Sequence, residues 1–512
     1  MNSRVQNVSS SLHIYIIAAL SSILLSSWIS EREFVINTDA ICYLQSAETI
    51  GTSGLREAMH LCGQARWPFY SLLIFLFSAM SSLSYTASAY VLNGVFSCVM
   101  VTTFLAIIQK LGGSRRVLWL AALVILTAHE VNSVKQYIIR DHGFWAFYLL
   151  SCYLLLQYFE QFQRRYAFAW NVSLLMATLF RVEGAFFLIF LPWISWLYRI
   201  KAYRAFIDLN ALTMGIVAIL VGWLAFHPEQ SLADWGRLQE IVSQATHGGY
   251  LVWQRFHETA INLGKYVLPS ESARDASWVL FFVVMLGYVQ NIIANLSVAY
   301  TLLVIYAWWK AQPIFKKSNQ LVLYGYLFVN VLVTGVFFLQ HLFLSKRYLI
   351  ALSIILMVWV PFALDDLLKQ YQSDTRVIVR RVFLPILALL IFISALGGVF
   401  DFGYSKQYIR NAGHWVALNV PKTARLYSND SQVMYYSQHF GNEIFNKTQE
   451  YADVSVIEHG KWKRYDFLAI RINKQDFIDQ SAFLQKLPLI PVRVFANKRG
   501  DQVRIYQVKG YY

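Results

Sequence analysis

The sequence predicts a polytopic α-helical membrane protein that ends in a small extramembrane α/β domain. Of the 512 residues, 57% are hydrophobic and only 14% are charged, and the mean hydropathy is +0.43. Apolar runs long enough to cross about 30 Å of hydrocarbon recur between residues 12 and 400. After residue 400 the runs become short and strand-like. We therefore expect a transmembrane domain over residues 1–400 and an extramembrane domain over residues 401–512.

The first apolar run predicts a membrane anchor. Arg4 precedes the run from Leu12 to Ile29, but Ser-Trp-Ile-Ser-Glu follows it in place of a small-x-small cleavage site. We expect the run to be retained, with the N-terminus inside. Lys and Arg then concentrate in short loops between later runs, which is the signal of cytoplasmic loops. The net charge of +15 therefore reflects topology and does not indicate a nucleic-acid partner.

Five basic clusters on the inner side fix the predicted topology. Segments 67–84 and 276–289 would place a cluster on the wrong side if they crossed, so we expect half-inserted or interfacial helices there. Trp67-Pro68 supports the first, because proline is tolerated at the first helical position. About eleven crossings remain, and they put the C-terminal domain outside. They are 12–30, 87–109, 117–134, 143–159, 167–182, 184–199, 207–226, 290–309, 320–341, 348–366 and 382–400.

Under this topology, ionisable residues gather at the outer ends of the helices and in the loop from His227 to Asp275. Such residues are often only anchors that reach the membrane surface. Their sharing one face favours a functional site there. The candidate site residues are Asp39, Arg66, Arg140, Asp141, Arg181, Glu183, Lys346, Arg347 and Tyr348.

Each motif also has a purely structural interpretation. Arg181 and Glu183 can form an ion pair that closes a helical hairpin. The two cations before Tyr348 suit a lipid phosphate, and they suit a plain interfacial anchor equally well. Asp141, at the start of a helix, can simply stabilise the helix dipole. The sequence leaves both interpretations open at these positions.

The motifs occur in the order Asp39, Trp67-Pro68-Phe69-Tyr70, Arg140-Asp141, Leu179-Phe-Arg181-Val-Glu183-Gly184 and Arg347-Tyr348. In this order and on this side of the membrane, the chain resembles the GT-C superfamily of membrane glycosyltransferases. The resemblance is in particular to the branch of dolichyl-phosphate-mannose protein mannosyltransferases and aminoarabinose lipid A transferases. It covers roughly residues 10–400.

The resemblance implies an inverting transfer of a hexosyl or pentosyl group from a polyprenyl phosphate to a lipid, glycan or protein acceptor on the outer face of the membrane. It implies that Asp39 is the catalytic carboxylate, that Asp141 fills the acidic position of the second loop and that Arg347 lies near the donor phosphate. The family often carries paired acids in the first loop. Here Ala40 follows Asp39, which disfavours a metal-bridging site.

The residue types are consistent with this chemistry. The incoming hydroxyl needs a base, a role that suits Asp39, and the departing phosphate needs cations. Arg347, Tyr348, Lys346 and Arg66 are the candidate phosphate-binding residues, with Arg140, Arg181 and Glu183 in support. A single phosphate leaving group does not demand a divalent metal, and His60 and Cys62 lack a second ligand pair, so we expect no metal site and no required cofactor. The expected partners are the donor lipid, an unidentified acceptor and the bilayer.

Two of the four cysteines lie in the first outer loop. If the protein occupies a bacterial inner membrane, as we expect, Cys42 and Cys62 face an oxidising compartment, where a disulfide would brace the loop that carries Asp39. Spacing alone does not establish the geometry, so paired and free thiols both remain open. Cys98 and Cys152 lie within spans and are expected to be packing residues.

The C-terminal segment predicts a compact domain with a mixed sheet. Strand-like runs and a hairpin alternate with two helical runs, and acceptor binding and bracing of the membrane domain are both open as roles. The predicted strands are Ala424–Tyr427, Val454–Ile457, Tyr465–Ile472 and a hairpin around Lys498-Arg-Gly500-Asp501, and the predicted helices are Gln432–His439 and Gln475–Leu487.

Three other functions compete with this interpretation. An oligosaccharyltransferase or ligase that uses a diphosphate-linked glycan is the nearest alternative. A transporter also needs ionisable residues among helices, but transporters place them near the midplane and carry internal repeats, which this sequence lacks. A non-catalytic scaffold would explain the C-terminal domain but not the charges clustered on one face.

Overall fold

The computed structural model describes residues 11–32, 35–227, 238–310, 315–373, 378–400, 402–439, 460–474 and 487–508. The chain divides into two compact units. The helical unit comprises Met1–Ser27, Leu92–Lys135 and Arg140–Asp401, and the mixed unit comprises Trp28–Val91, Gln136–Ile139 and Phe402–Tyr512. The predicted change at Asp401 is thus one edge of the mixed unit, which also takes in the first loop region.

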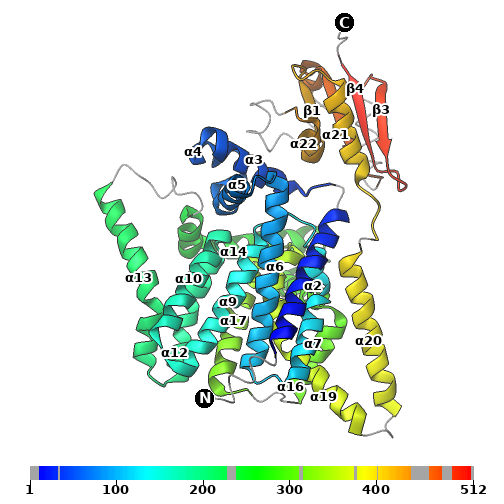
Figure 1. Cartoon of the computed structure of the whole chain (residues 1–512). Coiled ribbons are helices and arrows are strands. Elements are labelled where there is room, and N and C mark those ends of the chain that lie inside the picture. Colours follow the sequence, from blue (N-terminus) through cyan, green and yellow to red (C-terminus); the bar gives the residue numbers. More distant parts are fainter. Residues whose placement is uncertain are drawn as a thin grey trace. The chain divides into compact units, whose positions relative to one another are not determined.

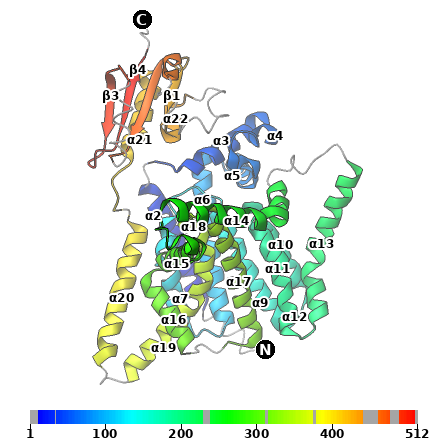
Figure 2. The same ribbon diagram turned by 180° about the vertical axis from the view of Figure 1, so that it is seen from behind.

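The helical unit is a bundle in which α9, α10 and α17 pack side by side (Figure 1). Seen from behind, α16 and α19 lie at the same end of the bundle (Figure 2). Its helices are α2 (Leu12–Arg32), α6 (Tyr85–Lys110), α7 (Arg115–Leu126), α8 (His129–Ser133), α9 (Asp141–Gln161), α10 (Arg164–Phe180), α11 (Gly184–Phe190), α12 (Ile194–Tyr198), α13 (Ala202–Phe226), α14 (Leu238–Tyr266), α15 (Ala276–Leu296), α16 (Val298–Trp309), α17 (Lys317–His341), α18 (Lys346–Leu356), α19 (Val360–Ser373) and α20 (Ile378–Val399). The first residues of α6 and the last of α2 belong to the mixed unit.

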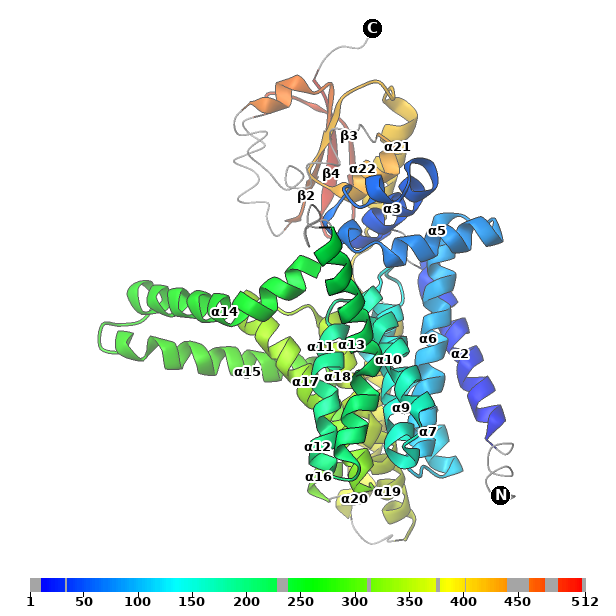
Figure 3. The same ribbon diagram turned by 90° about the vertical axis from the view of Figure 1, so that its left-hand side faces the viewer.

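Two helices leave the bundle at a steep angle. Figure 3 shows α14 and α15 projecting sideways from the other helices of the unit. The predicted loop from His227 to Asp275 is therefore wrong over Leu238–Tyr266, which forms a helix of 29 residues. This segment is amphipathic and contains many polar residues, so it lacks the long apolar run that predicts a helix in a membrane protein.

The predicted boundary at residue 290 is also wrong. Helix α15 continues through Gln290 to Leu296, and the break comes at Ser297, whose φ is +73°. Polar residues at 290 and 291 interrupt the apolar run in the sequence but not the helix, because the Asn291 side chain donates to the Gly287 carbonyl at 2.8 Å. The predicted span 117–134 likewise ends early, since α7 stops at Leu126 and α8 is a separate short helix.

Among the described residues, seven helices are long and apolar enough to cross a membrane. Three shorter apolar helices accompany them: Phe69–Ser81, Gly184–Tyr198 and Val298–Trp309. Helix α15, with the turn before it, is one of the seven by length and composition. The predicted crossings that fall outside these seven lie on helices that are shorter or more polar.

The mixed unit begins with a compact group of helices. They are α3 (Thr38–Ser53), α4 (Leu55–Ala58), η1 (Gly63–Arg66) and α5 (Phe69–Ser81). A disulfide joins Cys42 of α3 to Cys62 just before η1, with 6.1 Å between the Cα atoms. Helix α5 has 13 residues, about 20 Å of length, which is short of the roughly 30 Å of hydrocarbon. Its length therefore supports the prediction of a half-inserted or interfacial helix at 67–84.

A four-stranded sheet completes the mixed unit, with the strand order β1-β2-β4-β3. Strands β1 and β2 pair in parallel, whereas β4 pairs antiparallel with both β2 and β3. The hairpin predicted around Gly500 is confirmed. The predicted strand Val454–Ile457 and residues 475–486 of the predicted helix Gln475–Leu487 lie outside the described residues. The elements are α21 (Gln407–Asn419), β1 (Leu426–Ser428), α22 (Ser431–Ser437), η7 (Lys461–Arg464), β2 (Phe467–Ile472), β3 (Pro491–Ala496) and β4 (Gln502–Gln507).

Sidedness of α5 can be tested by labelling single introduced cysteines. Ser53→Cys replaces an exposed residue at the end of α3, before α5, and Ser81→Cys replaces the exposed last residue of α5. A helix too short to cross returns the chain to the side it came from, so we expect a membrane-impermeant maleimide to label both from the same side. Lys317→Cys, in a predicted inner loop, should label only from the opposite side. Labelling of the first two positions from opposite sides would contradict the predicted topology.

Candidate functional site

A cavity of about 370 Å³ lies in the helical unit. Three arginines and one glutamate lie among its lining residues, whereas most of its other walls are apolar or aromatic. A charged region beside a long apolar wall suits an amphiphilic ligand with an anionic head. The lining residues are Arg140, Phe144, Trp145, Arg181, Val182, Glu183, Phe186, Phe187, Phe190, Asn330, Leu332, Val333, Thr334, Val336, Phe337, Gln340, Leu344, Arg347, Tyr348 and Ala351.

Arg181 is the most enclosed of the three arginines. It lies at the end of α10, is only 6% exposed and forms ion pairs with both Asp141 and Glu183. Its guanidinium carbon also lies 4.4 Å from the centre of the Tyr348 ring. A buried cation needs such partners because desolvation costs several kcal/mol per ion. The positive charge of Arg181 is therefore compensated by carboxylates of the protein itself.

Close packing of α9 against α10 brings these residues together. A Cβ atom at Gly143 would come within 2.3 Å of the Phe180 ring, so a side chain at this position would force the first turn of α9 away from the end of α10. Asp141 lies two residues before Gly143, and Arg181 directly follows Phe180. The absence of a side chain at Gly143 thus allows the close packing of α9 against α10 that brings Asp141 to Arg181.

The ion pair also sets the protonation state of Glu183. Burial by itself would raise the pKa of this carboxyl, but the charge of Arg181, its hydrogen bonds and the charge of Arg140 lower the pKa to about 2. The carboxylate therefore stays ionised from neutral pH down through its ordinary pKa, and the pair weakens only as the pH falls toward 2. A group with so low a pKa is a poor general base near neutral pH.

Arg140 and Arg347 complete the charged region of the cavity. The Nη1 atom of Arg140 is buried and has no hydrogen-bond partner among the described residues. The guanidinium carbon of Arg347 lies 5.4 Å from the centre of the Tyr348 ring. Three arginines face the two carboxylates of Asp141 and Glu183, so the region carries an excess of positive charge.

Lys346 does not line this cavity. Its Nζ donates to Glu130 at 2.8 Å, and its backbone carbonyl accepts from Asn295 at 2.6 Å. Glu130 is buried, and its Oε1 atom also lies 3.5 Å from Nε2 of His129. Glu130 was not among the predicted site residues, although an acidic residue inside the predicted span 117–134 is a usable signal.

Asp39 and Arg66 belong to the mixed unit. Asp39 lies in the first turn of α3, and its Oδ1 accepts from Gln64 Nε2 at 3.0 Å. Gln64 follows Cys62 by two residues, so the disulfide to Cys42 holds η1 and its glutamine beside α3. The open question about the two cysteines is thus answered by the structure, and the pair braces the segment that carries Asp39. Arg66 is exposed at the end of η1.

Asn37 joins two distant segments of the mixed unit. Its Oδ1 accepts from the Ile138 amide at 2.9 Å, and its Nδ2 donates to the Ile138 carbonyl at 3.2 Å. Residues 136–139 immediately precede Arg140 and Asp141 in the chain. Asn37 and Gln64 were not among the predicted site residues, because an uncharged amide side chain does not stand out in the charge pattern of a sequence.

The predicted site residues thus fall into two groups. The helical unit brings Arg140, Asp141, Arg181, Glu183, Arg347 and Tyr348 together around one cavity. Lys346 is directed to Glu130, and the mixed unit holds Asp39 and Arg66. The catalytic and phosphate-binding roles of these residues remain predictions.

A larger cavity, of about 430 Å³, lies in the C-terminal part of the mixed unit between α21 and β3. Tyr408 and Phe495 form part of its wall, Lys498 is its one charged lining residue, and no carboxylate lines it. In the described part of the chain, no group of three or more His, Cys, Asp or Glu residues could hold a metal ion.

No protein-family model and no curated protein matches the sequence. Among solved structures, the chain is similar to the Archaeoglobus fulgidus oligosaccharyltransferase in complex with Zn and sulfate, with a TM-score of 0.52, 13% identity and coverage of 85% of this chain and 58% of that one. The same archaeal enzyme tethered to an acceptor peptide gives a TM-score of 0.51, 13% identity and coverage of 80% and 57%. A mycobacterial arabinofuranosyltransferase, AftD, gives a TM-score of 0.47 at 13% identity over 97% of this chain and 41% of that one.

The two archaeal matches show the fold. The chain shares the fold of the archaeal oligosaccharyltransferase over 85% of its own residues and spans about 58% of the length of that enzyme. The predicted polytopic α-helical fold with a small C-terminal sheet region is confirmed, and the chain is a multi-pass integral membrane protein.

The disulfide can be verified by counting alkylated thiols. Only Cys98 and Cys152 are free cysteines in the structure. Denatured protein treated with iodoacetamide without reductant should therefore gain two labels by intact mass, and reduced protein should gain four. Four labels without reductant would show that Cys42 and Cys62 are free thiols.

Removing Arg181 should destabilise the helical unit. Arg181→Met leaves Asp141 and Glu183 without their cation, and breaking a buried pair in this way costs about 3–5 kcal/mol. Thermal and chemical unfolding in detergent or nanodiscs measure the loss. The exposed Arg165→Met on the same helix is the matched control and should be nearly neutral. Adding Asp141→Asn to Arg181→Met should restore part of the stability, and equal stability of the two arginine variants would contradict the assignment.

Proposed function

We propose that the protein transfers a sugar from a polyprenyl-phosphate donor to a lipid, glycan or protein acceptor on the outer face of the membrane. The cavity of the helical unit is the observation that carries this proposal. Its excess of arginine charge suits a phosphate, and its aromatic and aliphatic walls suit the first isoprene units of the lipid. The GT-C architecture supports the same reaction class.

The proposed reaction is a single displacement at the anomeric carbon. The acceptor oxygen forms a bond to that carbon, the bond from the carbon to the phosphate oxygen breaks, and the configuration inverts. The lipid phosphate leaves with the bonding electrons, and Arg347 and Arg140 stabilise its growing charge. The acceptor proton passes to Asp39, the role that resemblance to the superfamily implies.

The arginines have separate tasks in this proposal. Arg181 is neutralised by two carboxylates and therefore serves to hold the shape of the cavity. Arg140 retains a buried N–H group that is available to a ligand. Because a guanidinium presents a planar pair of donors, Arg347 can hold two phosphate oxygens at once.

A diphosphate-linked glycan is the second candidate donor. The specific observation in its favour is the fold match to an oligosaccharyltransferase. A diphosphate leaving group carries more charge than a monophosphate, and enzymes commonly neutralise it with a divalent metal. The nature of the donor therefore distinguishes the two candidates. A transporter would give neither transfer product.

Transfer by the purified protein tests the proposal directly. In nanodiscs with a panel of polyprenyl-phosphate sugars, we expect wild-type transfer, a loss of about 10²–10⁴ in kcat for Asp39→Asn and a loss of about 10²–10³ for Arg347→Ala, with partial retention in Arg347→Lys. Glu48→Gln, an exposed change on the same helix as Asp39, and Arg165→Ala are the matched controls. Undiminished transfer by Asp39→Asn would remove its assignment as the base.

Metal dependence provides an independent test. A monophosphate donor places no requirement for a divalent cation on the site, so EDTA should leave the transfer rate unchanged within about twofold. Loss of activity in EDTA that Mg²⁺ or Mn²⁺ restores would favour the diphosphate donor. Activity with a polyprenyl-diphosphate glycan and not with the monophosphate would decide the same question.

A further inference from the structure

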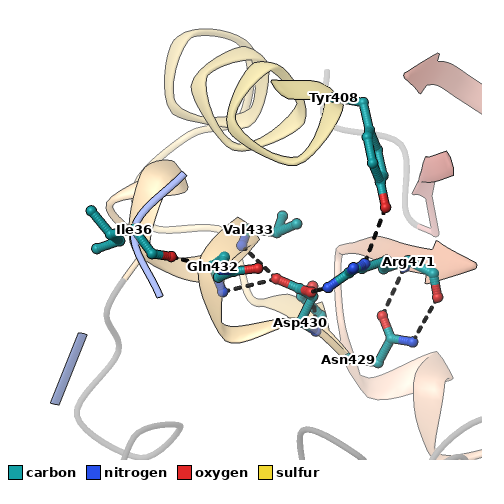
Figure 4. Close-up of polar contacts among 8 residues, drawn as sticks. Ile36, Tyr408, Asn429, Asp430, Gln432, Val433 and Arg471 are labelled. Carbon is teal, nitrogen blue, oxygen red and sulfur yellow. Dashed lines mark hydrogen bonds and ion pairs between the residues drawn. The ribbon is translucent and has the colours of Figure 1, made fainter. Parts of the chain in front are cut away.

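Residue Ile36, three positions before Asp39, is bound through both of its backbone polar groups. Gln432 Nε2 donates to the Ile36 carbonyl at 2.6 Å, and the Ile36 amide donates to the Tyr436 hydroxyl at 2.9 Å. Both side chains come from α22 in the C-terminal part of the chain (Figure 4 shows the contact of Gln432 with Ile36). A sequence separation of about 400 residues is bridged here by two direct hydrogen bonds.

The preceding residue is part of the core of the C-terminal domain. Val35 is only 2% exposed and packs in one hydrophobic cluster with residues of α21, α22 and the sheet. Burial of an apolar side chain is a main source of folding free energy, so this contact anchors the segment. The segment that leads to Asp39 is therefore built into the C-terminal domain and does not merely touch it.

A polar network fixes the helix that holds Ile36. Asp430 caps α22 by accepting from the amides of Gln432 and Val433 at 2.9 and 3.0 Å. Arg471 of β2 donates to the other oxygen of Asp430 at 2.6 Å and to the Tyr408 hydroxyl at 3.2 Å. Figure 4 shows this chain of contacts from the sheet to Ile36. The sheet thereby sets the position of Gln432.

Contacts on the other side of Ile36 continue the restraint. Asn37 is held by both backbone groups of Ile138, and Asp39 accepts from Gln64, which the disulfide keeps in place. The start of α3 thus has fixed points at Val35, Ile36, Asn37 and Asp39. Small displacements of a reacting group cost large factors in rate, so restraint of this kind has a direct catalytic meaning for a base.

We propose that Gln432 and Tyr436 are positioning residues for Asp39, so that the C-terminal domain is a structural part of the catalytic apparatus. This inference rests on the proposed function, in which Asp39 is the base. Of the two roles that the sequence left open for this domain, the contacts at Val35 and Ile36 support bracing. The side chains act through the backbone of Ile36 and touch no substrate.

The test compares two variants with two matched controls in the full-length protein. Gln432→Ala and Tyr436→Phe each remove one hydrogen bond to Ile36. Gln502→Ala and Tyr465→Phe remove comparable bonds elsewhere in the same domain, to Arg504 and Arg464. We expect the first two to lower kcat about tenfold or more with donor KM changed less than twofold. Both controls should retain wild-type kcat, and all four should unfold at similar temperatures.

A double-mutant cycle separates positioning from general destabilisation. If Gln432 acts through Asp39, then Gln432→Ala should lower kcat no further in the Asp39→Asn background. Additive losses would overturn the inference, as would wild-type kcat in both Gln432→Ala and Tyr436→Phe. A parallel fall of kcat in the two control variants would do the same.

Hydrogen–deuterium exchange distinguishes failure of this inference from failure of the proposed function. We expect faster uptake in the peptide covering residues 35–44 for Gln432→Ala and Tyr436→Phe, and wild-type uptake for Gln502→Ala and Tyr465→Phe. If the wild-type protein transfers no sugar, the proposed function fails while this measurement still reports on the restraint. Unchanged uptake in all four variants would overturn the restraint itself.

Discussion

The helical unit depends on the ion pairs that compensate the buried charge of Arg181 inside an apolar bundle. The compensating charges are two carboxylates from neighbouring elements, Asp141 and Glu183. The partners come from the start of α9 and the turn before α11, so the pairing also fixes the junction of three helices. Since an uncompensated charge there would cost several kcal/mol, the geometry of this junction is tightly constrained. Arg181 and Glu183 also line the cavity, so the same ion pair restrains this part of the cavity wall.

Neutralising Arg181 changes what the remaining charges can do. Arg140 and Arg347 border the same cavity, and the two carboxylates are already engaged by Arg181. The positive charge that this cavity offers to an anion therefore comes from Arg140 and Arg347, which lie among aromatic and aliphatic lining residues. Burial of a lipid chain attached to that anion against the apolar walls is also favourable. Charge and apolar area together thus favour an amphiphilic phosphate over a soluble one.

In the mixed unit the constraint is of a different kind, because three remote segments share one fold. Hydrogen bonds between the Asn37 side chain and the Ile138 backbone join residues 28–91 to residues 136–139, and the burial of Val35 joins the same segment to the core formed by α21, α22 and the sheet. The disulfide braces the first segment internally. None of these contacts relies on net charge, so they persist at high ionic strength. They give the segment that carries Asp39 a rigid support that a surface loop of the same length would lack.

The amino-acid sequence alone was enough to predict a polytopic helical membrane protein, because an apolar segment inside a bilayer must satisfy its backbone hydrogen bonds internally. It was also enough to predict the hairpin around Gly500. It also placed Arg181 beside Glu183, which are neighbours in the chain. Other contacts became visible only in the folded chain. Asp141 is a second partner of Arg181, and Lys346 pairs with Glu130. Cys42 is bonded to Cys62, and the side chains of Gln64 and Gln432 support the segment that carries Asp39. Apolar periodicity and charge are local properties that a sequence displays directly. The partner of a buried polar group is chosen by packing between distant segments, and no local pattern encodes it.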